Sequence, residues 1–379
     1  MKKIGVLTTH PIQYQAPMHK KLDDMYDLDV YFAHNESKQE KKKSAFGVEF
    51  EWPKEILEGY SYSYLKNISK NKSVNTFFGC NTPEIIKKIK ENKYDAFIVH
   101  GWYTLSYWQA ILACNYYHIP IMVRTDSTLN EFRPHIVKLL KKIFYRLLIN
   151  RFDAFLAVGI KNKEYLIYYG ADTERVFFSP HFVDATYFTP KNIDNVGRIK
   201  VIRLLFVGSL IDRKRPLDIV YAASKLKNQD IDLEINYVGS GNLTDKIVQE
   251  AKACQVQVNM IGFLNQNELI KEYMSNDIFI LPSQEESWGL VVNEAMMAGI
   301  PVITTIGVGC AADLIVEGVT GELYNPGDIN QLARKINKIS SNLNDYKQED
   351  ILKHIETYSV DNCIVGISEA VNVLSNNFK

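Results

Sequence analysis

Cysteine is scarce in this sequence, and the few cysteines that it has are scattered. The five of them, in 379 residues, form no C-x-x-C pair and no cluster with histidine, which argues against a disulfide framework and a zinc site. Such cysteine usage fits a reduced, cytoplasmic protein. The sequence also lacks the roughly 20 clean apolar residues that a membrane-spanning helix needs. The apolar run near Met1 breaks at Thr8, so we predict a first strand there and no signal peptide.

An excess of charge of either sign is missing as well, since 44 basic residues balance 44 acidic ones. The balance is uneven along the chain, with 26 basic and 19 acidic residues in residues 1–180, and 18 and 25 in residues 181–379. A basic first half favours an anionic partner, such as a phospholipid surface or a phosphorylated acceptor, although a random excess of solvated lysines explains it equally well. No nucleic-acid partner is expected.

Short apolar runs alternate with helical patterns, which indicates βαβ units around parallel sheets. In the first half, strands are predicted at residues 4–7, 28–32, 96–100, 121–124 and 154–158. After a polar break at 180–197, the pattern restarts with strands at 203–207, 233–238, 258–261, 278–281 and 302–305. We therefore predict an α/β protein with two domains, residues 1–184 and 185–356. Ligands in such folds bind at the carboxyl ends of the strands.

The segment from Ser283 to Glu294 carries the strongest chemical signal. It reads as a loop at the end of a strand, followed by a helix, and such a helix start offers free backbone N–H groups to a diphosphate. Gly289 lets the backbone approach a ligand closely. Glu286 would face the ligand from the loop, and Glu294 would lie on the same side of the helix. Taken alone, Glu286 could equally be a helix-start acid and Glu294 a solvated helix residue.

The E-x7-E pattern of Glu286 and Glu294, with its Pro-Ser lead-in and Glu-Ala-Met continuation, resembles the retaining glycosyltransferases of family 4, which have the GT-B fold. Further segments resemble the same family in the correct order, and together they cover about half of the chain. They are Ser179-Pro-His-Phe-Val-Asp184, Phe206-Val-Gly208-Ser-Leu210, Tyr237-Val-Gly239-Ser-Gly241, Ile261-Gly-Phe263-Leu, Thr304–Asp313 and Gly318–Tyr324. The resemblance implies two Rossmann-like, doubly wound domains that face each other across a cleft. It also implies that a terminal helix in residues 357–379 packs back on the first domain.

The resemblance also implies a donor site in the second domain for a nucleotide-diphosphate sugar, with no metal and no further cofactor. Lys214 and Arg213 would neutralise the diphosphate, Glu286 would orient the donor sugar, and Glu294 would bind the ribose. The donor-side residues that we expect are Gly208, Ser209, Arg213, Lys214, Gly239, Phe263, Glu286, Ser287, Trp288, Gly289, Leu290, Val291 and Glu294. Lys214 and Glu286 are expected to be catalytic, together with Asp126.

This sequence departs from the family pattern at several positions. Ser209 stands where the family often has arginine, so the phosphate charge falls to Arg213 and Lys214; Arg213 could also be an ordinary surface charge. Arg215 follows the lysine where glycine is usual. The tripeptide Ser287-Trp288-Gly289 replaces Gly-Phe-Gly, so Trp288 either reshapes the sugar pocket or packs between the domains.

The first domain matches the family less well and is expected to bind the acceptor. The loop after its first strand lacks the usual Gly-Gly and has His10 and Gln13 instead, both predicted to face the ligand unless His10 is a satisfied turn residue. Asp126 stands where the family often has a histidine near the reacting centre. A carboxylate there could bind acceptor hydroxyls, take up a proton, or merely cap the following helix. His100 ends the preceding strand on the same side.

A basic, amphipathic segment occupies residues 132–152, where seven apolar residues follow helical spacing and no acidic residue occurs. Such a helix could lie on an anionic membrane, or it could pack on its own sheet and leave a wet basic face. We therefore expect a cytoplasmic protein, with contact to the inner face of the membrane as the bolder alternative.

These observations predict a retaining transferase that moves a sugar from a UDP-sugar, or a GDP-sugar, to a hydroxyl of a glycan, glycolipid or lipid-linked acceptor. Cell-surface polysaccharide or glycoconjugate synthesis is the expected setting. A nucleotide-sugar epimerase or a phosphorylase of the same fold is an alternative, as is a non-catalytic subunit that only binds the nucleotide sugar.

Overall fold

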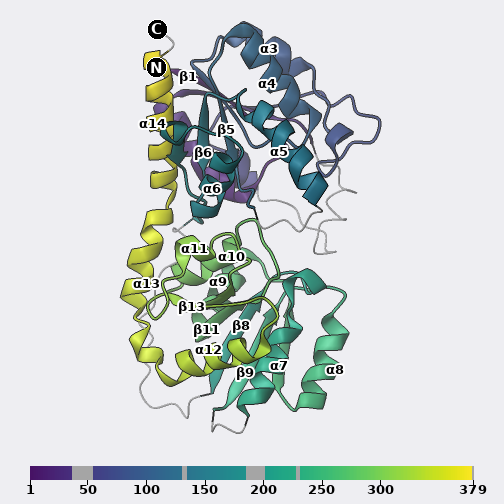
Figure 1. Ribbon diagram of the computed structural model, residues 1–379, viewed down its shortest axis with the longest axis vertical. Helices are drawn as coiled ribbons and strands as arrows, with labels where there is room; N and C mark the ends of the chain where they lie inside the picture. Colours follow the sequence, from purple (N-terminus) through teal and green to yellow (C-terminus); the bar gives the residue numbers. More distant parts are fainter. Residues whose placement is uncertain (36–53, 130–134, 185–200, 228–230, 378–379) are drawn as a thin grey trace. The chain divides into compact units, whose positions relative to one another are not determined.

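The computed structural model describes residues 1–35, 54–129, 135–184, 201–227 and 231–377. These residues form two compact units, each built around its own parallel sheet (Figure 1). Unit 1 comprises the described residues up to His181 and those from Val360 onward, and unit 2 comprises those from Phe182 to Ser359.

Unit 1 contains a seven-stranded sheet in the order β3-β2-β1-β4-β5-β6-β7, with every neighbouring pair parallel. Its strands are β1 (Lys3–Thr8), β2 (Asp27–Phe32), β3 (Tyr62–Tyr64), β4 (Ala96–Val99), β5 (Ile121–Thr125), β6 (Ala154–Ala157) and β7 (Val176–Phe178). The central strands are apolar at nearly every position because helices cover both faces of the sheet.

Helices surround this sheet on both sides. Figure 1 shows α3, α4 and α5 together on one side of unit 1 and α14 on the other. The helices are α1 (Ala16–Met25), α3 (Glu84–Asn92), α4 (Leu105–Tyr117), α5 (His135–Ile149), α6 (Ile160–Tyr168) and α14 (Val360–Asn377), with short 3₁₀ turns at η1 (Gln13–Gln15), η2 (Lys54–Leu57), η3 (Phe77–Gly79) and η4 (Thr173–Arg175).

Helix α14 connects the end of the chain to unit 1, where it packs on α1, β6 and β7. Gly366 permits this close approach, because a Cβ at that position would lie 1.8 Å from the carbonyl oxygen of Phe178. Tyr26 of α1 also donates a hydrogen bond to the hydroxyl of Ser368, at 2.9 Å. The last helix of the sequence is thus part of the first unit.

Unit 2 contains a six-stranded parallel sheet in the order β10-β9-β8-β11-β12-β13. Its strands are β8 (Ile202–Val207), β9 (Leu233–Val238), β10 (Gln257–Gly262), β11 (Ile278–Leu281), β12 (Val302–Thr305) and β13 (Gly321–Tyr324). Its helices are α7 (Leu217–Leu226), α8 (Thr244–Cys254), α9 (Gln266–Ser275), α10 (Leu290–Met297), α11 (Ala311–Leu314), α12 (Ile329–Ser341) and α13 (Gln348–Ile355), with 3₁₀ turns at η6 (Asp212–Lys214), η7 (Leu343–Asp345) and η8 (Glu356–Tyr358).

Both sheets reverse their winding direction at one point, between β1 and β4 in unit 1 and between β8 and β11 in unit 2. Loops that follow the strands on either side of such a point run in opposite directions and leave room for a ligand at the carboxyl edge. The predicted α/β class with parallel sheets is confirmed. The predicted polar break at 180–197 lies largely outside the described residues, as does the start of the basic segment at 132–134.

Candidate functional site

The predicted donor residues of unit 2 gather at its winding reversal, in the loops after β8, β9, β11 and β12. The first two loops touch through glycine: a Cβ on Gly239 would lie 2.1 Å from the carbonyl oxygen of Gly208. Both glycines have positive φ angles, 147° for Gly208 and 124° for Gly239, a region that side chains avoid. The space beside Gly208 is taken by the side chain of Lys214, whose Nζ lies 3.3 Å from the position of a Cβ. Ser209, half-buried, follows in the same loop.

Glu286 lies between the two predicted phosphate-binding cations. Its Oε1 lies 2.9 Å from Nζ of Lys214, and its Oε2 lies 3.2 Å from Nη1 of Arg213. The hydroxyl of Ser283 donates a third bond to Oε1, at 3.1 Å. Arg213 also donates to the carbonyl of Glu285 at 2.7 Å. Arg213 is therefore more than a surface charge, since it joins the η6 turn to the loop after β11.

The charge of Glu286 is maintained by these neighbours. Burial by itself would raise the pKa of Glu286, but the ion pairs with Lys214 and Arg213 outweigh burial and lower the pKa below its ordinary value. The side chains of Glu286 and Lys214 are only 13% and 16% exposed. The site therefore holds two cations and one ionised carboxylate at neutral pH.

Helix α10 presents its first amides to the same place. Gly289 immediately precedes it with a φ of 101°, and Leu290 is its first residue. In the described part of the chain, the backbone N–H groups of Leu290 and Val291 donate to no acceptor. Unpaired amides at a helix start favour an anionic ligand. Because α10 begins at Leu290, Glu286 belongs to the loop and is not a helix-start acid.

The loop after β12 packs against the loop that carries Glu286. A Cβ on Gly309 would lie 1.8 Å from the carbonyl oxygen of Ser287, and one on Gly307 would lie 2.2 Å from that of Gln284. The N–H of Gly309 donates to the carbonyl of Glu286 at 3.0 Å. The two glycines allow one backbone to lie directly against the other, which holds the loop of Glu286 in place.

Glu294 lies on α10, eight residues after Glu286, and is not a solvated residue. Burial raises the pKa of Glu294 to about 7, and the hydrogen bond from Tyr273 opposes only part of that shift. The hydroxyl of Tyr273, on α9, donates to Oε2 at 2.8 Å. The residue as a whole is half-buried, so the enclosed part is its carboxyl group. A carboxyl enclosed in this way is suited to hydrogen-bonding hydroxyl groups.

The remaining donor-side residues differ in how accessible they are. Phe263, after β10, is 39% exposed, as a residue that stacks on a base would need to be. Ser287 is exposed. Trp288 is only 5% exposed, donates from Nε1 to Oδ1 of Asn293 at 2.9 Å, and lies 6.1 Å from the ring of Tyr358. The indole therefore packs inside unit 2, so only the backbone of Trp288 is accessible to a ligand.

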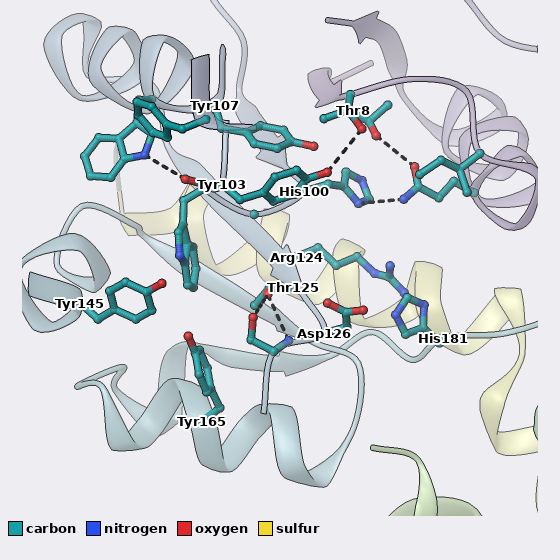
Figure 2. A pocket seen from close by; sticks show the side chains of 18 of the residues that line it. Thr8, His100, Tyr103, Tyr107, Arg124, Thr125, Asp126, Tyr145, Tyr165 and His181 are labelled. Atoms are coloured by element: carbon teal, nitrogen blue, oxygen red, sulfur yellow. Dashed lines mark hydrogen bonds between the residues drawn. The ribbon is translucent and has the colours of Figure 1, made fainter. Parts of the chain in front are cut away.

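Unit 1 has a cavity of about 780 Å³ at the carboxyl ends of β1, β4 and β5, its own winding reversal. Figure 2 shows polar side chains at one end and aromatic ones at the other. The lining residues used below are Tyr14, Gln15, Phe77, His100, Trp108, Arg124, Asp126, Phe144, Tyr145 and His181. An elongated molecule with a polar and an apolar end would fit such a lining.

The polar end is organised around the buried guanidinium of Arg124. It donates from Nη2 to the carbonyls of Ser179 and Pro180, at 3.2 and 2.9 Å. Burial, and then the charge of Arg124, holds the pKa of His100 and His181 well below the usual histidine range, so both rings are neutral at neutral pH. Asp126 lies beside them in Figure 2.

The structure brings two of the four predicted acceptor-side residues into this cavity. His100 and Asp126 line it, whereas His10 and Gln13 do not. Nδ1 of His10 lies 3.0 Å from the hydroxyl of Thr9, so His10 is the satisfied turn residue of the alternative interpretation. Asp126 does not begin a helix, because the described residues that follow it, 127–129, are not helical.

Four further residues line the cavity and were not predicted: Tyr14, Gln15, Arg124 and His181. Arg124 had a visible signal, since a charged residue inside a buried strand needs a special environment. His181 lies in the segment that resembles the family linker. Gln15 had no signal in the sequence. Its Nε2 lies 3.3 Å from Nδ1 of His100, and that contact joins residues far apart in the sequence. Within the described ranges, no group of three His, Cys, Asp or Glu side chains could hold a metal ion.

Two family profiles cover most of the chain. A profile described as "Glycosyl transferases group 1" matches residues 192–353, and one described as "Glycosyltransferase Family 4" matches residues 48–187. The chain belongs to the group 1, or family 4, glycosyltransferases. The group 1 profile contains the whole segment from Gly208 to Glu294 that forms the cluster of unit 2.

Individual family members resemble the chain over shorter stretches. The D-inositol 3-phosphate glycosyltransferase of Pseudarthrobacter chlorophenolicus is 34% identical over 174 residues, which are 43% of this chain and 41% of that protein. The chain thus spans less than half the length of this relative.

Solved structures of the same fold match along almost the whole chain. The lipopolysaccharide outer core galactosyltransferase WaaB superposes with a TM-score of 0.74 at 17% identity, over 98% of this chain and 99% of that one. HepE from Anabaena, in complex with UDP and glucose, superposes with a TM-score of 0.69 at 15% identity, over 98% and 100%. The predicted GT-B fold is confirmed.

Proposed function

We propose that this family member transfers a sugar from a nucleotide-diphosphate sugar to a hydroxyl group of an acceptor. The observation that carries the proposal is the cluster of Glu286, Lys214 and Arg213 beside the unpaired amides of α10. Two cations and a helix start suit a diphosphate, and a fixed carboxylate next to them suits the hydroxyls of a sugar. The donor binds to unit 2 and the acceptor binds in the cavity of unit 1.

The chemistry that we propose uses these groups in separate roles. As the bond between the sugar and the diphosphate breaks, negative charge grows on the leaving oxygen, and Lys214, Arg213 and the amide of Leu290 stabilise it. Glu286 holds the donor sugar, and Glu294 binds the ribose. Asp126 binds the accepting hydroxyl or takes up its proton. These protein groups do the work that a metal ion would otherwise do.

The finer features rest on the family resemblance. We propose that transfer retains the anomeric configuration, as expected for the E-x7-E pattern. We favour UDP as the nucleotide, because HepE, of the same fold, was solved with UDP; GDP is the second choice. The acceptor is a glycan, a glycolipid or a lipid-linked sugar, and the setting is the synthesis of surface polysaccharide or glycoconjugate at the inner face of the membrane. No helix among the described residues is long and apolar enough to cross a membrane.

A thermal-shift screen of UDP-, GDP- and ADP-sugars against the full chain tests the donor site and selects the base. One of these is expected to raise the melting temperature, because a ligand that binds only the folded state stabilises it. Mass spectrometry of reactions with that donor then separates the alternatives. A glycosylated acceptor supports the proposal. An altered nucleotide sugar without acceptor, or a demand for free phosphate, would assign an epimerase or a phosphorylase instead.

A further inference from the structure

Helix α5 presents an apolar stripe to solvent instead of to its own sheet. Leu140, Ile143, Phe144 and Leu147 repeat at helical spacing and are 63%, 58%, 51% and 66% exposed. The helix packs on unit 1 with its other side, where Leu148 and Ile149 are buried. The alternative, in which the helix packs on its own sheet, thus holds for the side of Leu148, whereas four residues of the predicted apolar set remain exposed.

Helix α4 extends this stripe into a wider surface. The rings of Trp108 and Phe144 lie 5.8 Å apart, and Nδ2 of Asn115 donates to the carbonyl of Arg151 at 3.0 Å, so the two helices run side by side (Figure 1). One and two turns beyond Trp108, Leu112 and Tyr116 are 56% and 75% exposed. We call these six exposed residues the apolar band: Leu112, Tyr116, Leu140, Ile143, Phe144 and Leu147.

The charged residues of α4 and α5 themselves are all basic. Neither α4 nor α5 contains an acidic residue, whereas Lys142, Arg146 and Arg151 are exposed beside the band. Two of the lysines lie over aromatic rings: Nζ of Lys141 is 5.0 Å from the ring centre of Tyr145, and Nζ of Lys142 is 4.6 Å from that of Tyr168. An apolar helix face flanked by arginine and lysine is the pattern of a surface that lies in the headgroup layer of an anionic bilayer.

The cavity of unit 1 reaches this band through Phe144. Trp108 and Phe144 belong both to the cavity lining and to the helix surface that carries the band, and Phe77, 39% exposed, completes the aromatic end. The opposite end holds Asp126, His100 and Arg124. A polar head that reaches Asp126 would therefore leave its apolar tail at Phe144, beside the band.

We propose that the apolar band docks on an anionic lipid surface and that the cavity takes its acceptor from that surface, as a sugar attached to a lipid. The second half of this inference rests on the proposed transfer reaction; the first half does not. A peptide groove or a second copy of the chain would explain the apolar residues, but neither requires two helices that lack acidic residues.

Sedimentation with vesicles tests the docking directly. The full chain is mixed with vesicles of phosphatidylcholine alone or with about one-third phosphatidylglycerol. The double variant Ile143→Gln/Leu147→Gln changes two band residues that do not line the cavity. The matched control is Val248→Gln/Val365→Gln, two residues that are 46% and 53% exposed on other helices. Circular dichroism confirms that each variant is folded.

The wild type and the control are expected to sediment with anionic vesicles, and less with neutral ones or at high salt. The band variant should bind at least about tenfold more weakly, because each inserted apolar side chain contributes strongly to partitioning. If the wild type stays in solution with anionic vesicles, or if the band variant binds as well as the control, the docking is refuted. A wild-type dimer that the band variant abolishes would assign the surface to a second copy instead.

Transfer measurements test the lipid-borne acceptor. Dodecyl and methyl glycosides of the same sugars are offered in the presence of anionic vesicles, and the rate ratio of the two is compared between wild type and band variant. A ratio well above one that falls in the variant supports the inference, and a ratio near one contradicts it. If neither glycoside is glycosylated under any condition, the proposed function fails, while the sedimentation result still decides the docking.

Discussion

Replacing Lys214 with methionine removes one charge from the donor cluster while it keeps the length of the side chain. Nζ of Lys214 lies 2.9 Å from Oε1 of Glu286, and the side chain packs against Gly208. A hydrogen bond from a charged group to a phosphate oxygen contributes about 1.5–3 kcal/mol. At about 1.4 kcal/mol for each factor of ten, the Kd of UDP should rise about 10- to 100-fold.

Isothermal titration with UDP measures this change, and Lys225→Met, at an exposed position on α7, is the control for loss of a lysine from the same unit. The fold should survive, because Glu286 retains Arg213 and Ser283, although the free energy of unfolding should drop by about 1–2 kcal/mol. A Kd for UDP within about twofold of wild type would refute the assignment of Lys214 to the diphosphate.

The variant Glu286→Gln tests whether Glu286 orients the donor sugar or only forms a structural ion pair with Lys214 and Arg213. If the carboxylate only neutralised Lys214 and Arg213, its loss would leave transfer intact. If Glu286 orients the donor sugar, Glu286→Gln should bind UDP as tightly as the wild type, or more tightly, because two cations are released from their ion pairs. The same variant should lose transfer.

Asp126→Asn should lower transfer by about 100-fold or more while the Kd of UDP stays unchanged, because the donor binds to the other unit; initial rates and titration check this. Gly239→Ala should lower the free energy of unfolding by about 3 kcal/mol or more, because the added Cβ would collide with the carbonyl of Gly208. Gly262→Ala should lower it by only about 1 kcal/mol, because Gly262 has a φ of 83° but open space around the position of a Cβ. Urea denaturation measures both changes. Burial raises the pKa of Glu294 from 4.5 to about 7, so wild-type stability should fall as pH rises through that window. Glu294→Gln should remove this fall in stability. If the free energies of unfolding of the two proteins change with pH in parallel, the raised pKa of Glu294 is contradicted.

Much of the fold could be predicted because the central strands are buried on both faces and stand out as apolar runs. Of the edge strands, β10 was predicted at 258–261, whereas β3, β7 and β13 could not be predicted. In β3, Tyr62 and Tyr64 are exposed, and β7 is only three residues long with no buried residue, so neither has a clear pattern. Strand β13 follows a turn and contains the buried Glu322, whose charge is stabilised by Lys335 and Lys338 from α12. Because Glu322 interrupts the apolar run, the sequence of β13 does not have the pattern of a buried strand.

The donor cluster was predictable because its members lie in loops whose sequence has a recognisable order, from Gly208 to Glu294. The pairing of Glu286 with both Lys214 and Arg213 was not, since it depends on how two loops from different strands meet. The acceptor cavity was harder still. Tyr14, Gln15 and His181 come from three distant segments, and none of them has a local pattern that distinguishes it from a core or turn residue.

We propose that residues 283–294, with Lys214 and Arg213, position a nucleotide sugar for transfer. The most direct test incubates the wild type and Glu286→Gln with the nucleotide sugar selected by thermal shift and with an acceptor glycoside, and follows the product by NMR. The account predicts that the wild type forms a product whose anomeric configuration matches that of the donor. It predicts that Glu286→Gln, folded and still binding the nucleotide, forms essentially none. Near-normal turnover by Glu286→Gln would contradict the claim.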